Sequence, residues 1–76
     1  MPRITPIDWR SLVKVFEAEG FTKVRQKGSH IVLEKAGVAR PLVIPIYDAI
    51  GIAIIKSNLK TAGISRERYF ELLEQL

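Results

Sequence analysis

The sequence predicts a small α+β domain in which helices pack on one face of a three-stranded antiparallel sheet. Three observations support this fold class. An apolar stripe at helical spacing lies within residues 6–19, two runs with strand character follow at 21–26 and 30–35, and a third run at 40–45 precedes two more helical patterns. We therefore expect the order α-β-β-β-α-α within a single domain that spans residues 1–76.

The first helix is predicted from its start signals and its apolar spacing. Thr5 fits the N-cap, Pro6 the first helical position, where no N–H is needed, and Asp8 the first turn, where its charge meets the positive end of the helix dipole. Gly20 is placed for a left-handed cap at the C-terminus of this helix. The side chains expected to face the core recur at i, i+3, i+4 and i+7: Trp9, Leu12, Val13 and Phe16.

A β-hairpin is predicted to turn at Lys27-Gly28, with glycine where the turn needs a positive φ. Because side chains alternate between the two faces of a strand, Lys23, Arg25 and Lys27 are expected on one face of the first strand. Residues 22–31 contain three cations and no acid. The stretch therefore has the charge that suits a phosphate-bearing ligand.

The second strand places the only histidine of the chain at the mouth of this hairpin. Ile31 and Leu33 are expected to face the first helix, so His30 points away from the core, beside the cations of the first strand. The third strand is flanked by Pro41 and Pro45, which cannot donate to a ladder, so it is expected at an edge of the sheet. The face opposite the helices is expected to be open to water.

The second helix is predicted to begin at Asp48 as its cap and to end at Gly63. Gly51 is expected to weaken its first turn by up to ~1 kcal/mol relative to alanine. The positions expected to be buried are Ile52, Ile55, Leu59 and Ala62.

The third helix is predicted to begin after Ser65, which fits its N-cap. Ile64 and Tyr69 stand at the two positions of a hydrophobic staple, which fixes the angle at which the chain enters a helix. The apolar stripe is expected to continue through Leu72, Leu73 and Leu76.

Composition limits the classes of function. The chain has a formal charge of +4, is 47% hydrophobic and contains no cysteine, so it has neither a disulfide framework nor a thiolate metal site. With one histidine and no carboxylate cluster at ligand spacing, we expect chemistry without a metal or other cofactor. No apolar run approaches the ~20 residues of a membrane-spanning helix, and no signal-peptide h-region is present. We therefore expect a cytoplasmic protein without a membrane partner.

Four stretches together indicate a family. These are Gly20-Phe21, the run Arg25-Gln26-Lys27-Gly28-Ser29-His30, a strand that ends in Pro45, and the run Leu59-Lys60-Thr61-Ala62-Gly63-Ile64-Ser65 before the last helix. In them the chain resembles the HicA toxins of type II toxin–antitoxin systems, over nearly its whole length. The resemblance implies a fold like the double-stranded RNA-binding domain, an mRNA-cleaving activity carried by the hairpin histidine, and neutralisation by a HicB-like antitoxin.

The resemblance also assigns roles to positions in this chain. The family's catalytic histidine corresponds to His30, and its glycine to Gly28. Many members carry a second histidine two residues after the strand-ending proline, where this chain has Tyr47. They also carry a Gly-Thr pair at the start of the second helix, where this chain reads Ile50-Gly51-Ile52. Because this region flanks the hairpin, the departures bear on substrate binding rather than on the fold.

Cleavage of RNA without a metal uses the neighbouring 2′-OH as nucleophile, so one group must accept its proton and others must offset the negative charge of the transition state. Histidine titrates near neutral pH and suits the first task, which makes His30 the candidate base. The second task has four candidates: Arg25, Lys27 and the backbone N–H groups of Gly28 and Ser29.

Other residues keep more than one interpretation. Lys56, on the second helix, either contacts an RNA backbone or keeps that helix soluble. Lys23 fits a solvated strand face, and Tyr47 either stacks on a base or lies in its loop without a task. One histidine cannot act as base and acid in the same step, so the leaving-group proton falls to water, Lys27 or Tyr47.

Two other functions fit the same residues. The first is a non-catalytic RNA-binding module of the same fold, which the altered start of the second helix favours. The second is an interaction module whose open sheet face or edge strand docks a protein. RNA fragments that depend on His30 would favour the ribonuclease. Salt-sensitive binding of RNA without fragments would favour the non-catalytic RNA-binding module.

Overall fold

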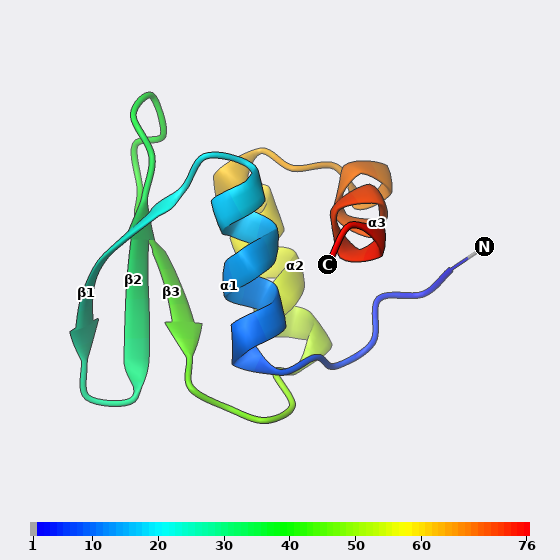
Figure 1. Ribbon diagram of the computed structural model, residues 1–76, viewed down its shortest axis with the longest axis horizontal. Coiled ribbons are helices and arrows are strands. Elements are labelled where there is room, and N and C mark those ends of the chain that lie inside the picture. Colours follow the sequence, from blue (N-terminus) through cyan, green and yellow to red (C-terminus); the bar gives the residue numbers. More distant parts are fainter. Residues whose placement is uncertain (1) are drawn as a thin grey trace.

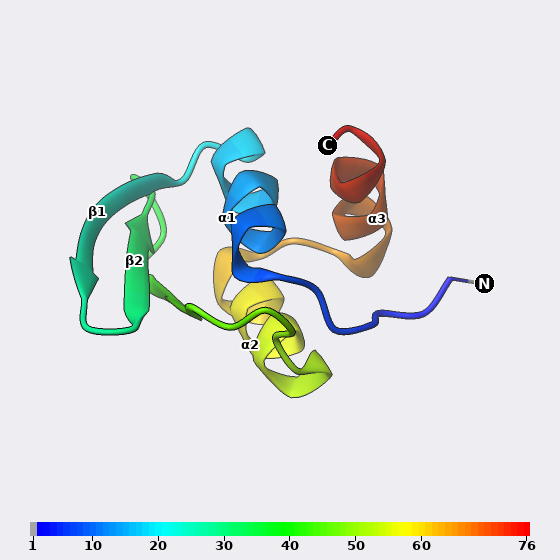
Figure 2. The same ribbon diagram turned by 60° about the horizontal axis from the view of Figure 1, so that its bottom comes forward.

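The computed structural model describes residues 2–76 and has the predicted order of elements. These are α1 (Trp9–Ala18), β1 (Thr22–Lys27), β2 (His30–Glu34), β3 (Leu42–Pro45), α2 (Ile52–Ala62) and α3 (Arg66–Glu74). The strands form one antiparallel sheet in the order β1-β2-β3, with β3 at an edge as expected. Figures 1 and 2 show all three helices on one side of the sheet, with α3 farthest from it. The predicted fold class is confirmed.

Helix α1 begins later than the sequence indicated. Its N-cap is Asp8, whose carboxylate accepts hydrogen bonds from the backbone N–H of Ser11 at 3.2 Å and from the Ser11 hydroxyl at 2.7 Å. Thr5 is therefore not the cap. The residues before Asp8 are held extended by a tertiary bridge in which Ile50 N–H donates to the carbonyl of Ile7 at 2.7 Å. This bridge overrides the local helix-start signal.

The core lies between the sheet and the helices. The predicted positions of α1 are buried: Leu12, Val13 and Phe16. Val15 is buried as well, because α1 contacts the sheet on one side and α3 on the other. Trp9 is partly buried at the margin of the core. The sheet contributes four fully or almost fully buried side chains: Ile31, Leu33, Leu42 and Ile44.

Helix α2 also begins later than predicted, with Gly51 rather than Asp48 at its N-cap. Gly51 therefore lies outside the helix and does not weaken its first turn, since glycine is tolerated at an N-cap. Gly63 ends the helix with a φ of +72°, as expected. Asn58, which is buried, donates from Nδ2 to the carbonyl of Val43 at 3.3 Å, so α2 covers part of the free edge of β3.

Helix α3 has the predicted cap and packs against α1. The Ser65 hydroxyl accepts a hydrogen bond from the N–H of Arg68 at 3.1 Å. Tyr69 is fully buried. The Arg68 guanidinium also bonds the Glu19 carboxylate at 2.7 Å, which joins α3 to the end of α1. Two residues predicted to be buried are exposed, namely Ile52 (40%) and Leu76 (55%).

The face of the sheet opposite the helices is uncovered by any helix in Figure 1. Val32 on this face is nevertheless only 6% exposed, because the side chains of its strand neighbours surround it. This face is therefore open at its rim and apolar at its centre. Within residues 2–76, no helix has the length and apolar character needed to cross a membrane.

Candidate functional site

The β1–β2 hairpin ends in a two-residue turn. Lys27 and His30 are direct cross-strand partners, so Gly28 and Ser29 form the turn between them. Gly28 has a φ of +59° and Ser29 does not have a positive φ, a pattern that suits a type II′ turn with glycine in first place. The turn thus lies one residue later than the predicted Lys27-Gly28 pair, and it sets His30 directly opposite Lys27.

A hollow of about 560 Å³ lies beside this turn, on the outer face of the sheet. Its floor contains the cross-strand pair Val32 and Val43, and His30 lies at the turn end of the same face. Arg25 stands opposite Val32, and Lys27 opposite His30. Side chains of directly opposed residues start from Cβ atoms about 4.5–5.5 Å apart. The register therefore brings the imidazole close to Lys27 and places Arg25 diagonally from it, in the lining of the same hollow.

The two cations at this hollow are exposed, as is His30. Among residues 2–76, neither Arg25 nor Lys27 takes part in a side-chain hydrogen bond or an ion pair. In the turn, the Gln26 side-chain amide donates a long bond of 3.4 Å to the carbonyl of Gly28. A shallow apolar floor with unpaired positive groups at its rim has the chemistry to bind a nucleotide, whose base is apolar on its faces and whose phosphate is anionic.

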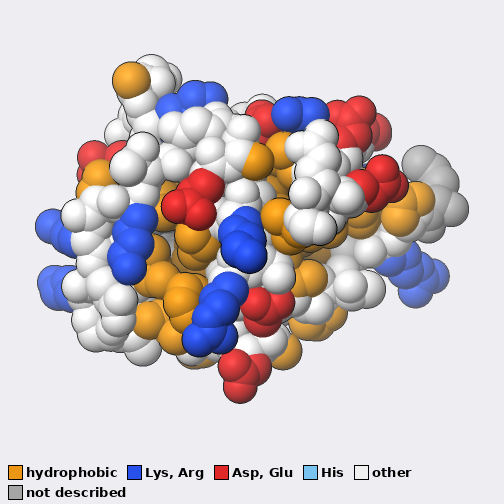
Figure 3. All heavy atoms as spheres, in the orientation of Figure 1, with side chains coloured by type: hydrophobic (Ala, Val, Ile, Leu, Met, Phe, Trp, Pro, Cys, Tyr) orange, Lys and Arg blue, Asp and Glu red, His pale blue; other side chains and the backbone are white. Residues whose placement is uncertain are grey.

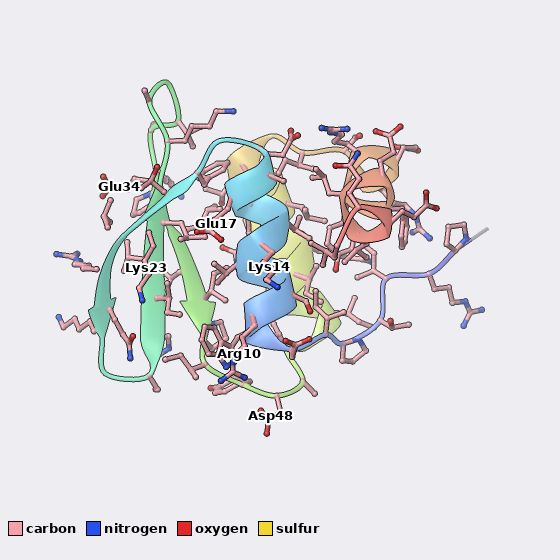
Figure 4. The ribbon with its side chains drawn as sticks, viewed as in Figure 1. Arg10, Lys14, Glu17, Lys23, Glu34 and Asp48 are labelled. Atoms are coloured by element: carbon pink, nitrogen blue, oxygen red, sulfur yellow. The ribbon has the colours of Figure 1, made fainter. Side chains whose placement is uncertain are left out.

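Lys23 does not lie with the other two cations of β1, contrary to the predicted alternation. The register of the hairpin shifts between Lys23 and Arg25, which is a β-bulge, and Lys23 stands opposite Leu33, a core residue. A bulge adds a residue to one strand and changes the face on which the following side chains lie. Lys23 therefore faces the helix side, where Figure 4 shows it on one surface with Lys14 and Glu17 of α1. In Figure 3 basic and acidic side chains are interspersed on this face.

Comparison with known proteins identifies the family. A family model described as HicA toxin of bacterial toxin-antitoxin matches residues 9–64, well over half of the chain. The chain belongs to the HicA toxin family. The match includes the whole sheet, the hairpin and helix α2. Neither the comparison with curated proteins nor the comparison with solved structures found a match. Membership confirms the resemblance that the sequence indicated and implies a cognate antitoxin.

In this HicA-family protein, Lys56 lies apart from the other predicted RNA contacts. It is exposed on α2 and does not line the hollow at the hairpin. The side of α2 that faces β3 carries Ile54, Ser57 and Asn58 instead. Arg25, Lys27, Gly28, Ser29 and His30 all line that hollow. The functional roles of all six residues stay predictions.

The loop between β3 and α2 lies beside the hairpin turn, as the resemblance implied, and the structure adds the main-chain hydrogen bonds that join them. Ile46 N–H donates to the carbonyl of Ser29 at 2.8 Å, and the carbonyl of Tyr47 accepts from Trp9 N–H at 3.0 Å. The hairpin turn, this loop and the start of α1 consequently lie at the same end of the HicA-family fold, at the bottom of Figure 1. The apolar floor residues Val32 and Val43 were not predicted as part of the site.

No group of three or more potential metal-binding side chains gathers anywhere in residues 2–76. A second hollow, of about 520 Å³, lies at the opposite end of the sheet. It is lined by Glu34 and Lys35, by small and apolar residues of the β2–β3 connection, and by Gly20 and Thr22 at the start of β1. It contains one charge of each sign and no histidine, so the hairpin hollow is the better candidate for RNA chemistry.

Proposed function

We propose that this HicA-family protein is an endoribonuclease that cleaves mRNA without a metal, with His30 as its general base. The observation that supports the proposal best is the hairpin hollow, in which one histidine and two unpaired cations surround an apolar floor. Toxins of this family are known as mRNA interferases. The proposal extends that family activity to named residues of this chain.

In the proposed reaction His30 accepts the proton of a ribose 2′-OH, whose oxygen attacks the adjacent phosphorus. The bond from phosphorus to the 5′-oxygen breaks, so the products are a 2′,3′-cyclic phosphate and a 5′-hydroxyl. General base catalysis of this kind contributes typically ~10²- to 10⁴-fold to a rate. An exposed imidazole at the end of a strand is accessible to a ribose of a bound RNA.

Negative charge on the phosphate grows as the 2′-oxygen attacks. Arg25 and Lys27 flank His30 on the same face and are free to bind the non-bridging oxygens. Fixed donors that point at developing charge stabilise a transition state more than mobile water does. Gly28 leaves open space at the turn, since a Cβ there would meet no atom within 4 Å, so a phosphate can approach the backbone N–H groups of the turn.

The leaving 5′-oxygen needs a proton, and one histidine does not supply it in the step in which it acts as base. Lys27 stands directly opposite His30 and is one possible donor. Water and Tyr47, which is 49% exposed in the adjoining loop, are the others. With one catalytic histidine we expect slow turnover, which suffices for a toxin that acts on a limited pool of messages.

We also propose that a HicB-like antitoxin restrains this activity. A gene for a small protein next to the one that encodes this chain would support that pairing. Arg25 and Lys27 offer an acidic partner two unpaired positive groups at the site itself. Purified antitoxin is expected to stop cleavage at a one-to-one ratio.

The decisive experiment incubates the full-length protein with an end-labelled mRNA in the presence of EDTA. We expect fragments with 2′,3′-cyclic phosphate ends from the parent protein and a loss of at least ~100-fold in the initial rate for His30→Ala. Arg40→Gln, a change of an exposed cation at the other end of the sheet, is the matched control and should cut at the parental rate.

Each alternative gives a different result in this assay. Cleavage by His30→Ala at the parental rate would exclude His30 as the base. Fragments that need Mg²⁺ would contradict the metal-independent reaction. RNA binding without fragments from the parent protein would favour the non-catalytic RNA-binding module.

A further inference from the structure

A second group of residues at the hairpin end of the molecule has the chemistry to bind a nucleotide. It consists of Tyr47, in the loop between β3 and α2, and Arg10 and Trp9, at the start of α1. We propose that Tyr47 and Arg10 hold a nucleotide of single-stranded RNA next to the one that His30 cleaves, with the base stacked on Tyr47 and the phosphate on Arg10. This inference rests on the proposed ribonuclease function.

Tyr47 is a large aromatic residue that the fold exposes while fixing its backbone. Its side chain and backbone together are 49% exposed. Its N–H donates to the carbonyl of Pro45 at 2.9 Å, and its carbonyl accepts from Trp9 N–H at 3.0 Å. With both backbone groups bonded, the ring has little freedom to move apart from its own rotamers. A fixed, exposed aromatic ring is a stacking surface for an unpaired base.

Arg10 is also held in place. Its guanidinium carbon lies 4.6 Å from the centre of the Trp9 ring, within the range of a cation–π contact. Within residues 2–76, Arg10 forms no ion pair. Figure 4 shows Arg10 at the foot of α1 and Asp48 pointing out of the molecule below it. The other acid near Arg10 is Asp8, whose carboxylate is engaged in hydrogen bonds with Ser11. A guanidinium that keeps its charge and is stacked on an indole is prepared for a phosphate.

The position of this pair relative to His30 follows from two backbone hydrogen bonds. Ile46, next to Tyr47 in the chain, donates to the carbonyl of Ser29, which precedes His30. Trp9, next to Arg10, donates to Tyr47 itself. The cleavage site and the proposed nucleotide site are therefore joined through main-chain contacts at one end of the fold (Figure 1). In this series of main-chain contacts Tyr47 lies between His30 and Arg10.

The test measures binding of a short fluorescein-labelled single-stranded RNA of mixed sequence by the full chain carrying His30→Ala, so that the RNA stays intact. In this background Tyr47→Ala is expected to weaken RNA binding about tenfold. Tyr47→Phe should bind as tightly as the His30→Ala protein, because stacking needs the ring and not the hydroxyl. Arg10→Gln is expected to weaken binding and to lower the slope of log affinity against log salt by about 0.7, the value for one phosphate contact on a single strand.

The controls separate this inference from a loss of fold and from general charge effects. Arg40→Gln removes the same charge at the other end of the sheet. Its affinity for RNA should stay within about twofold of that of the His30→Ala protein, since salt screens charges at that distance. Every variant should unfold cooperatively, and Arg10→Gln should melt no more than about 8 °C below the His30→Ala protein, since it loses only its exposed contact with Trp9. The same RNA annealed to its complement should show no difference between Tyr47→Ala and Tyr47→Phe, since paired bases are not free to stack on a side chain.

Three outcomes would overturn the proposal. The first is parental affinity in both Tyr47→Ala and Arg10→Gln, even where these variants lose affinity for the antitoxin. The second concerns Tyr47→Phe in the protein that keeps His30. If this variant bound RNA normally but cut it at least ~100-fold more slowly than the parent, the Tyr47 hydroxyl would be the general acid rather than Tyr47 a stacking residue. The third is an equal loss on single and double strands. Cut RNA in the titration of the His30→Ala protein contradicts the role of His30 instead, and leaves the Tyr47 site standing.

Discussion

The two ends of the sheet carry similar residues but use them differently. At the β2–β3 end, Lys35 Nζ lies 5.7 Å from the centre of the Phe21 ring, and the Lys35 side chain passes Gly20, where an added Cβ would stand 3.4 Å from its Cε. At the hairpin end, Arg25 and Lys27 contact no acid and no aromatic ring within residues 2–76. The cations at both ends are exposed, but Lys35 contacts an aromatic ring of the fold, whereas Arg25 and Lys27 have no such contact.

This difference teaches how a small basic domain can separate stability from ligand binding. Each end has a turn with a positive-φ glycine and a hollow beside it. Only the hairpin end combines unpaired cations with an imidazole and a loop that the main chain joins to the turn. Net charge of +4 describes both ends together and does not distinguish them.

The largest expected effect comes from reversing one charge at each end. Lys27→Glu should lower the initial rate of RNA cleavage by about 100-fold, because it removes a donor to the phosphate and adds a repelling charge beside His30. Lys35→Glu should cut RNA near the parental rate and melt at a lower temperature, since it loses its contact with Phe21. Equal losses of cleavage in the two variants would show that the ends do not differ in function.

The glycines of the two ends provide the next comparison. Gly28→Ala and Gly20→Ala should each lower the free energy of unfolding by about 1–2 kcal/mol, measured by urea denaturation, because φ is +59° and +94° at these positions. Steric contact adds little at either position, since Gly28 faces open space and Gly20 faces only the flexible end of Lys35. A far larger loss for Gly20→Ala would mean that Lys35 is held rigidly, which would strengthen the contrast.

A change in the core serves as a reference for both ends. The Tyr69 hydroxyl is buried without a hydrogen-bond partner, and burial raises the pKa of Tyr69 to about 12. Tyr69→Phe removes the unpaired group and should leave the free energy of unfolding unchanged or raise it by up to ~1 kcal/mol. Its cleavage rate should equal that of the parent. A destabilised Tyr69→Phe protein would show that this hydroxyl does find a partner in solution.

The smallest expected effect concerns the cap of α1 at the hairpin end. Hydrogen bonds from the Ser11 hydroxyl and N–H lower the pKa of the Asp8 carboxyl below its ordinary value of 3.8. The folded protein thus takes up this proton at lower pH than the unfolded chain, so the cap contributes fully above about pH 4 and is lost as the pH falls further. In urea melts, the parent should lose up to ~1 kcal/mol more than Asp8→Asn on acidification, because asparagine also caps helices but does not titrate. If the free energies of unfolding of the parent and of Asp8→Asn fell equally on acidification, the Asp8 carboxylate would make no pH-dependent contribution to stability.

Much of the fold follows from local signals in the sequence. Helical apolar spacing, glycines that need a positive φ, the proline-flanked edge strand and the cap at Ser65 were each predicted and are each present. The family resemblance came from four stretches, of which the run at residues 25–30 is the most specific, and it is confirmed by the family match. The five hairpin residues predicted for the site line one hollow, while Lys56 lies elsewhere.

Two of the errors share a cause, since each concerns pairing between two segments of the chain. Thr5 has the chemistry of a cap, but the bridge from Ile7 to Ile50 keeps its segment extended. Lys23 alternates correctly with Arg25 in sequence, but the bulge between them puts the two on different faces. A bulge is an irregularity of pairing between two strands, and the sequence of one strand does not contain it.

The sequence by itself determined the class of fold, the hairpin and the presence of a histidine among cations, because helix spacing, turn conformation and charge are properties of residues close together in the chain. Only the tertiary structure decided which cations stand beside His30 and that Tyr47 and Arg10 lie at the same end. Those relations depend on strand register and on main-chain hydrogen bonds, from Ile46 to Ser29 and from Trp9 to Tyr47, that form once the core brings the elements together.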